Sequence, residues 1–194
     1  DFDTAMGKLS EKLAYATHLD QTGQQSFSLE LYQQCLDGFI ALHGSSDHHY
    51  LGVVYERMAG VYKQQGEHSK ALEYIHKALT IHLAQGETHP SVGNNYCNMA
   101  GVYKQQGEYV KALEYYHKAL SIQLTQGETH PSVGITYNDI GILYDKKKEY
   151  SKALEYYNKA LVIFLPLGPI HPYVQAANRN IANTTTRFLS SNSF

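Results

Sequence analysis

The sequence has few residues of the kinds that form disulfides, metal sites or membrane spans. Its 194 residues include no tryptophan, two cysteines and five prolines. Cys35 and Cys97 lie far apart and without the spacing of a metal site, so we expect neither a disulfide framework nor a bound metal. This cysteine usage favours a reducing compartment, and we expect a cytoplasmic location.

Charge of one sign and long hydrophobic runs are missing as well. The chain carries 16 basic and 18 acidic residues, a net charge of -2, with no long block of either sign. Nucleic-acid binding needs a basic stripe, so we expect no nucleic-acid partner. A membrane span needs about 18 or more apolar residues in a row, and their absence predicts no membrane partner.

Catalytic motifs are not recognisable. Gly60 and Gly101 are single glycines within expected helices and do not form a phosphate-binding loop. No local motif marks Cys97 as a nucleophile. We therefore expect no enzymatic activity and no cofactor.

What the sequence does contain is an internal repeat, a feature that sets the whole fold. Residues 60–93 and 101–134 are identical at 28 of 34 positions, with an offset of 41 residues. A third copy follows at the same offset, with KALEYYNKAL at 152–161. A linker with His-Pro recurs at 89–90, 130–131 and 171–172. Such a period is typical of a stack of supersecondary units.

Each copy predicts two amphipathic helices joined by a turn. In the middle copy Tyr96, Met99 and Tyr103 are spaced by three and four residues, which places them on one face of a first helix. Gly107 is expected to end that helix in the left-handed conformation. Pro131 is expected in the first turn of the helix that begins the next unit.

Small residues recur where the helices are expected to pack. The equivalent sets are Ala59, Ala100 and Gly141; Ala71, Ala112 and Ala153; and Ala78, Ala119 and Ala160. A larger side chain at these positions should overpack the interface, at a cost of roughly 1–3 kcal/mol.

The linker histidines recur once per unit. His89, His130 and His171, with His48 as a divergent fourth, would be spread along a stack, whereas metal ligands must converge. We interpret them as residues that brace helix starts.

The pattern of Met99-Ala100, Tyr103, Gly107, Tyr109, Ala112, Tyr116 and Ala119 resembles tetratricopeptide repeats over about 50–190. The His89-Pro90-Ser91-Val92 linker looks like the kinesin-light-chain subtype. This resemblance implies an all-α, right-handed α-solenoid of antiparallel helix hairpins. We expect one domain over 1–194, with a divergent repeat at 1–47, repeats at 48–88, 89–129 and 130–170, and a capping helix at 171–190.

The resemblance also implies a concave groove that binds an extended peptide or a segment of a partner protein. Matching residues by the family motif gives the groove as Glu56, Arg57, Lys63, Asn94, Cys97, Asn98, Lys104, Ile135, Asn138, Asp139, Ile142, Arg179 and Asn180. Asn98, Asn138 and Asn180 match family asparagines that contact the peptide backbone, and an amide offers both a donor and an acceptor. A slight excess of basic residues in and around this groove favours an acidic segment.

A second reading remains open. Near-identical repeats suit an array that associates with itself, or that regulates an enzymatic or ATPase domain elsewhere in a larger parent protein. Both this role and peptide binding are consistent with the repeat pattern.

Overall fold

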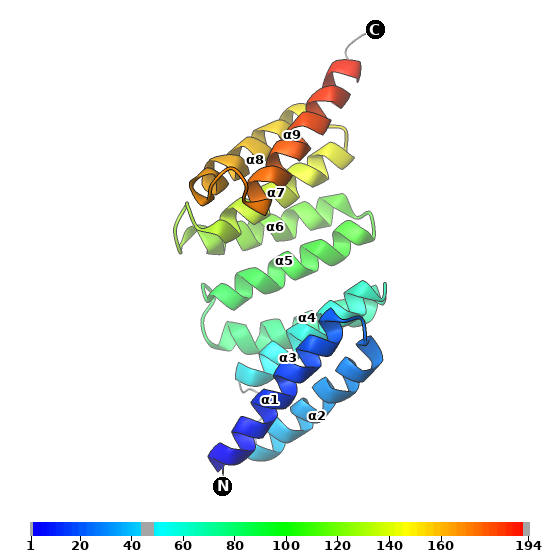
Figure 1. Ribbon diagram of the computed structural model, residues 1–194, viewed down its shortest axis with the longest axis vertical. Coiled ribbons are helices and arrows are strands. Elements are labelled where there is room, and N and C mark those ends of the chain that lie inside the picture. Colours follow the sequence, from blue (N-terminus) through cyan, green and yellow to red (C-terminus); the bar gives the residue numbers. More distant parts are fainter. Residues whose placement is uncertain (1, 44–48, 192–194) are drawn as a thin grey trace. The chain divides into compact units, whose positions relative to one another are not determined.

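The computed structural model describes residues 2–43 and 49–191, and these residues form helices without strands. The helices are α1 (Phe2–Gln21), α2 (Gln25–His43), α3 (His49–Gln64), α4 (His68–Ala84), α5 (Pro90–Gln105), α6 (Tyr109–Leu124), α7 (Pro131–Lys146), α8 (Tyr150–Phe164) and α9 (Pro172–Ser191), with a short 3-10 turn at Leu165–Leu167 (Figure 1). The predicted all-α class is confirmed, and α9 lies where the capping helix was predicted. His48 lies outside the described residues.

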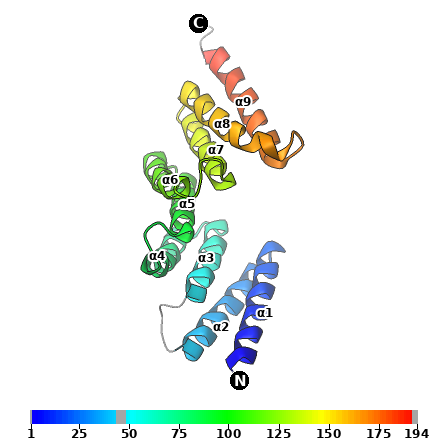
Figure 2. The ribbon, with the colours of Figure 1, turned by 90° about the vertical axis from the view of Figure 1, so that its left-hand side faces the viewer.

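The chain divides into two compact units, Asp1–Asn98 and Met99–Phe194. In the first unit α1 pairs with α2 and α3 pairs with α4, and α2 also packs on α3. In the second unit α7 packs on α6 and α8, and α8 packs on α9 (Figures 1 and 2). Each unit is therefore built from antiparallel helix hairpins. The expectation of one continuous solenoid domain stays a prediction.

Helix starts are braced by the linker histidines, as expected. The ring Nδ1 atoms of His89, His130 and His171 each accept a hydrogen bond from the backbone N–H two residues later, at 3.3, 3.2 and 3.3 Å. A proline follows each histidine and occupies the first helical position, where its missing N–H costs nothing. The linker therefore works locally as a helix start signal.

The turns within the hairpins use the left-handed backbone conformation. Gly66 and Gly107 have φ angles of 76° and 77°, which confirms the predicted role of these glycines. In the next copy the same place is taken by Lys148 with a φ of 63°. A lysine is strained in this region because its Cβ crowds the backbone.

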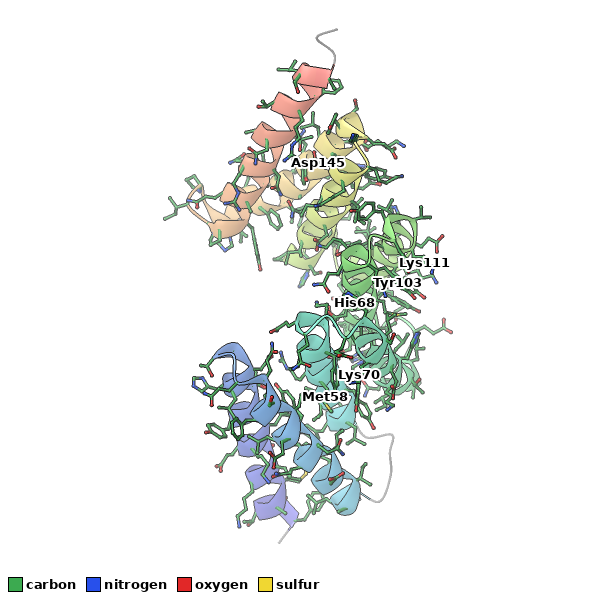
Figure 3. The ribbon with its side chains drawn as sticks, turned by 90° about the vertical axis from the view of Figure 1, so that its right-hand side faces the viewer. Met58, His68, Lys70, Tyr103, Lys111 and Asp145 are labelled. Carbon is green, nitrogen blue, oxygen red and sulfur yellow. The ribbon has the colours of Figure 1, made fainter. Side chains whose placement is uncertain are left out.

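The hairpin interfaces are closed by small residues and tyrosines. The eight recurring alanines are at most 2% exposed, as their positions predicted. Beside them the rings of Tyr103 and Tyr115 stack at 5.4 Å, and Lys111 lies over the Tyr103 ring at 5.3 Å (Figure 3). The neighbouring copies repeat this tyrosine pair at 5.3 and 5.4 Å, so the same contact closes each hairpin.

The first hairpin differs from the second in one row of side chains on its first helix, α1, which we call the outward row. Leu51, Val54, Met58 and Val61 of α3 are at most 2% exposed and belong to the core that α3 forms with α2. Their equivalents on α1, 43 residues earlier, are Lys8, Glu11, Tyr15 and His18, and all four are exposed. The α1 row is therefore polar where the α3 row is apolar.

Candidate functional site

Five of the predicted groove residues come together in the first unit. A cavity of about 480 Å³ is lined by Asp20, Glu56, Arg57, Gly60, Gln64, Asn94, Cys97 and Asn98. The α3 residues in this lining are spaced by three and four, which places them on one helix face. The α5 residues of the lining face them, and Asp20 is contributed by α1. Five residues chosen by the family motif therefore line one hollow, and their role in binding a partner stays a prediction.

Behind the cavity lies a buried polar network that the sequence did not reveal. The side-chain nitrogen of Asn95 lies 3.0 Å from Glu56 Oε1, 2.8 Å from His82 Nδ1 and 2.7 Å from the backbone oxygen of Ser91. Asn95 and His82 are fully buried, and the Glu56 side chain is 22% exposed. An amide NH2 has two hydrogens for these three acceptors. The three acceptors therefore share two hydrogens, so at least one of these contacts is weaker than a full hydrogen bond.

Glu56 is the member of this network whose pKa is shifted close to neutral pH. Burial raises the pKa of Glu56 to about 7, although the Arg57 guanidinium and the Asn95 amide favour the charged carboxylate. Burial, together with the neighbouring His49 and His89, lowers the pKa of His82 to about 4. His82 is therefore neutral at pH 7, while Glu56 is close to half-protonated.

A signal for this network was present in the repeat itself. His82 is one of six positions at which residues 60–93 differ from residues 101–134. Across the three copies this position and its partner on the next first helix change together, as His82–Asn95, Gln123–Thr136 and Phe164–Ala177. Thr136 donates to Gln123 Oε1 at 2.8 Å, whereas Phe164 and Ala177 pack in an apolar core. Buried polar groups need partners, so the pair has to change as a unit.

In the second unit, predicted groove residues pair with one another. Lys104 forms an ion pair with Asp139 at 2.7 Å. Asn180 Nδ2 donates to Asn138 Oδ1 at 3.0 Å. These contacts join α5 to α7 and α7 to α9. Asp145, which is labelled in Figure 3, pairs with Arg187 and accepts a hydrogen bond from Thr184.

A small second cavity lies beside the Asn138–Asn180 pair. Its volume is about 90 Å³, and its lining residues are Ile135, Asn138, Phe164, Tyr173 and Ala176. Two predicted residues, Ile135 and Asn138, therefore meet at one apolar hollow with an amide at its edge.

The remaining predicted residues are not gathered in the same way. Lys63, Ile142 and Arg179 do not line either of these two cavities. Lys63 and Ile142 are partly buried, and Arg179 is exposed. Their role in a groove stays a prediction.

Two further kinds of feature are metal-binding clusters and membrane-spanning helices, and neither is found within residues 2–43 and 49–191. Within these ranges no group of three or more His, Cys, Asp or Glu side chains is placed to hold a metal ion. Over the same ranges no helix combines the length and apolar character that crossing a bilayer requires. Cys35 and Cys97 are both free thiols.

Repeated hairpins with paired polar side chains on their first helices define an α-helical repeat protein. The tetratricopeptide repeat model matches residues 50–123 and 91–164, which together span more than half of the chain. The chain therefore belongs to the tetratricopeptide repeat family, whose members are protein-interaction scaffolds. No curated protein matches the sequence.

Solved structures share this fold at low sequence identity. The nearly identical TPR-like repeats of a proposed kinesin light chain from Podosopora anserina match with a TM-score of 0.74 and 21% identity, covering 92% of this chain and 86% of that chain. BtubC (BKLC) from P. vanneervenii gives a TM-score of 0.68 and 22% identity, covering 100% and 91%. The apo form of RapI gives 0.76 and 19%, covering 97% of this chain and 51% of that chain. This chain therefore spans about half of RapI.

Proposed function

We propose that this chain binds an extended segment of a partner protein against the polar first-helix faces of its units, and that binding rather than catalysis is its function. The observation that carries the proposal is the cavity of about 480 Å³, where residues of α3 and α5 selected by the family motif line one hollow. Cavities of this size with convergent polar groups are typical of binding sites.

The chemistry of these faces suits a peptide backbone. Asn94 and Asn98 in the first unit, and Asn138 and Asn180 in the second, each offer amide donors and acceptors. A neutral hydrogen bond contributes about 0.5–1.5 kcal/mol, whereas micromolar binding needs about -8 kcal/mol. Amides alone are therefore insufficient. The apolar hollow beside Ile135 and Tyr173 would supply part of the difference by accepting a small aliphatic side chain.

Peptides selected from a displayed library against the whole chain test this proposal. We expect the double variant Asn98→Ala, Asn138→Ala to bind the selected peptides at least tenfold more weakly. The reason is that each hydrogen bond lost between uncharged groups costs about 1 kcal/mol. Isothermal titration calorimetry measures the affinity, and circular dichroism checks that helix content is unchanged. The matched control is Asn158→Ala, whose amide is exposed on α8 and bonds to its own helix at Leu154. Equal affinities for the double variant and the control would contradict the proposal.

The self-associating alternative has less support. End-to-end stacking would use the outward row of α1, and that row is Lys8, Glu11, Tyr15 and His18. Buried charges without partners oppose such an interface. The cytoplasmic location and the absence of a nucleic-acid partner stay predictions, based on composition.

A further inference from the structure

The cavity of the first unit contains more acid than base. Its ionisable lining consists of the carboxyls of Asp20 and Glu56, the guanidinium of Arg57 and the Cys97 thiol, and the other lining residues are amides and a glycine. In the second unit Lys104, whose equivalent in the first unit is Lys63, forms an ion pair with Asp139. The lining of the first-unit cavity therefore holds two carboxyls and one guanidinium.

Both carboxyls are poorly solvated by their surroundings. Burial raises the pKa of Asp20 despite the lowering effect of the Arg57 charge, and Asp20 Oδ1 is buried without a hydrogen bond from any residue that the structure describes. Glu56 accepts from the fully buried Asn95, yet burial still raises its pKa. One guanidinium thus serves two desolvated acids, and it does not fully compensate either of them.

The size and polarity of the hollow determine which partner group fits. An anionic side chain would be repelled by two acids, and an apolar one would bury them further without a counter-charge. A lysine or arginine side chain brings the missing positive charge and several N–H donors to carboxylates that are already positioned. The neighbouring amides of Asn94 and Asn98 can then hold the backbone that carries it.

We propose that this cavity takes a lysine or arginine side chain of the bound partner segment, with Asp20 and Glu56 as its counter-charges. The inference rests on the proposed function, and it gives that function a charge preference opposite to the one expected from the sequence. Segments with a basic residue at this point are preferred over acidic ones.

Cation binding at this site is coupled to proton release. Glu56 is faced by Asp20 of α1, Arg57 of α3, His82 of α4 and Cys97 of α5. His82, with its pKa lowered to about 4, stays neutral above pH 6, and Arg57 stays charged. Since the pKa of Glu56 is raised to about 7, its ionised fraction rises about tenfold between about pH 6 and about pH 8. Affinity for a cationic side chain should rise by about the same factor.

Two short peptides that differ only in charge test the inference. The probes are acetyl-Ala-Ala-Lys-Ala-Ala-amide and the same peptide with norleucine in place of lysine, titrated into the ¹⁵N-labelled whole chain. We expect the lysine peptide to shift the side-chain amide signals of Asn94 and Asn98, with about tenfold tighter binding than the norleucine peptide. Equal binding of the two peptides, or no binding of the lysine peptide at millimolar concentration, would overturn the inference.

Two variants distinguish a contact made inside this cavity from a general effect of the protein's charge. Glu56→Gln keeps an acceptor for the Asn95 amide and should weaken the lysine peptide about tenfold while removing its pH dependence. Glu87→Gln makes the same charge change in the exposed α4–α5 linker and should leave affinity within about twofold, because an exposed charge is screened. Similar weakening in both variants would contradict the site. Selected peptides that bind the Asn98 and Asn138 faces without a basic residue would remove this inference and leave the proposed function intact.

Discussion

Glu56 and His82 are the two side chains whose environment most changes their chemistry. They lie 3.6 Å apart and share the Asn95 amide, and burial shifts both towards the neutral form. A carboxyl and an imidazole at this distance often form an ion pair. Here burial keeps His82 neutral and leaves Glu56 about half-protonated near pH 7.

These shifts predict how the stability of the chain depends on pH. The pKa of His82 falls from 6.5 to about 4 on folding, so the unfolded chain binds more protons and the His82 contribution is lost as pH falls from 6.5 through 4. The pKa of Glu56 rises from 4.5 to about 7, so its contribution is present below 4.5 and is lost as pH rises through 7. Between 4.5 and 6.5 the two trends oppose each other.

Without the Glu56 carboxyl, the loss of stability that His82 causes as pH falls should no longer be offset. We expect Glu56→Gln to lose stability on acidification from about pH 6.5 to about pH 4.5 more steeply than the unchanged chain, by roughly 1–3 kcal/mol over that range. Urea denaturation followed by circular dichroism at several pH values measures the slope. Glu87→Gln serves as the control and should follow the unchanged chain. Identical slopes for both variants would show that Glu56 titrates normally.

At the scale of elements, the second helix of one hairpin contacts the first helix of the next hairpin through a pair of residues. This pair is exchanged as a unit from copy to copy. His82–Asn95, Gln123–Thr136 and Phe164–Ala177 occupy equivalent positions in successive copies. A Cβ on Gly52 would lie 2.5 Å from His82 Nε2, and one on Gly134 would lie 2.6 Å from Phe164. The glycine leaves room for a large side chain, and the partner residue then matches its polarity.

Exchange of the whole pair between copies tests this interpretation. We expect His82→Gln with Asn95→Thr to retain stability, because it imports the hydrogen-bonded pair that joins Gln123 to Thr136 at 2.8 Å. Each single substitution should cost roughly 1–3 kcal/mol by leaving a buried polar group without its partner. Urea midpoints of the four proteins form a double-mutant cycle. Strictly additive losses would mean that the two positions do not act together.

Local signals predicted the helices and turns, whereas the contacts between side chains of successive helices could not be read from them. Gly66, Gly107 and the linker histidines act on their own turns, so their roles could be recognised from sequence alone. The pairing of Lys104 with Asp139 joins residues 35 apart and depends on how successive helices pack. Helix spacing shows which face a residue lies on, and it does not show which neighbour that residue meets. The Asn95 network was missed for this reason.

At the scale of the whole molecule, the polar row on α1 bears on association between copies. Lys8, Glu11 and His18 stand where α3 has Leu51, Val54 and Val61, all buried against α2. An apolar row at this place is what allows one hairpin to pack on another. A row with charges resists the same contact, because charges buried without partners are costly.

Converting this row should create an interface between copies. We expect the triple variant Lys8→Leu, Glu11→Val, His18→Val to form concentration-dependent oligomers, while the unchanged chain stays monomeric. Sedimentation velocity over a range of concentrations measures the difference. Oligomers of the unchanged chain that are insensitive to these residues would instead support the self-associating alternative.

The central claim is that partner segments bind on the first-helix faces. A photo-crosslinking residue placed at Asn94, and separately at Asn158 on the exposed face of α8, tests it most directly when each labelled chain is irradiated with a selected peptide. The account predicts crosslinks from position 94 and none above background from position 158. Crosslinks from position 158 without any from position 94 would contradict it.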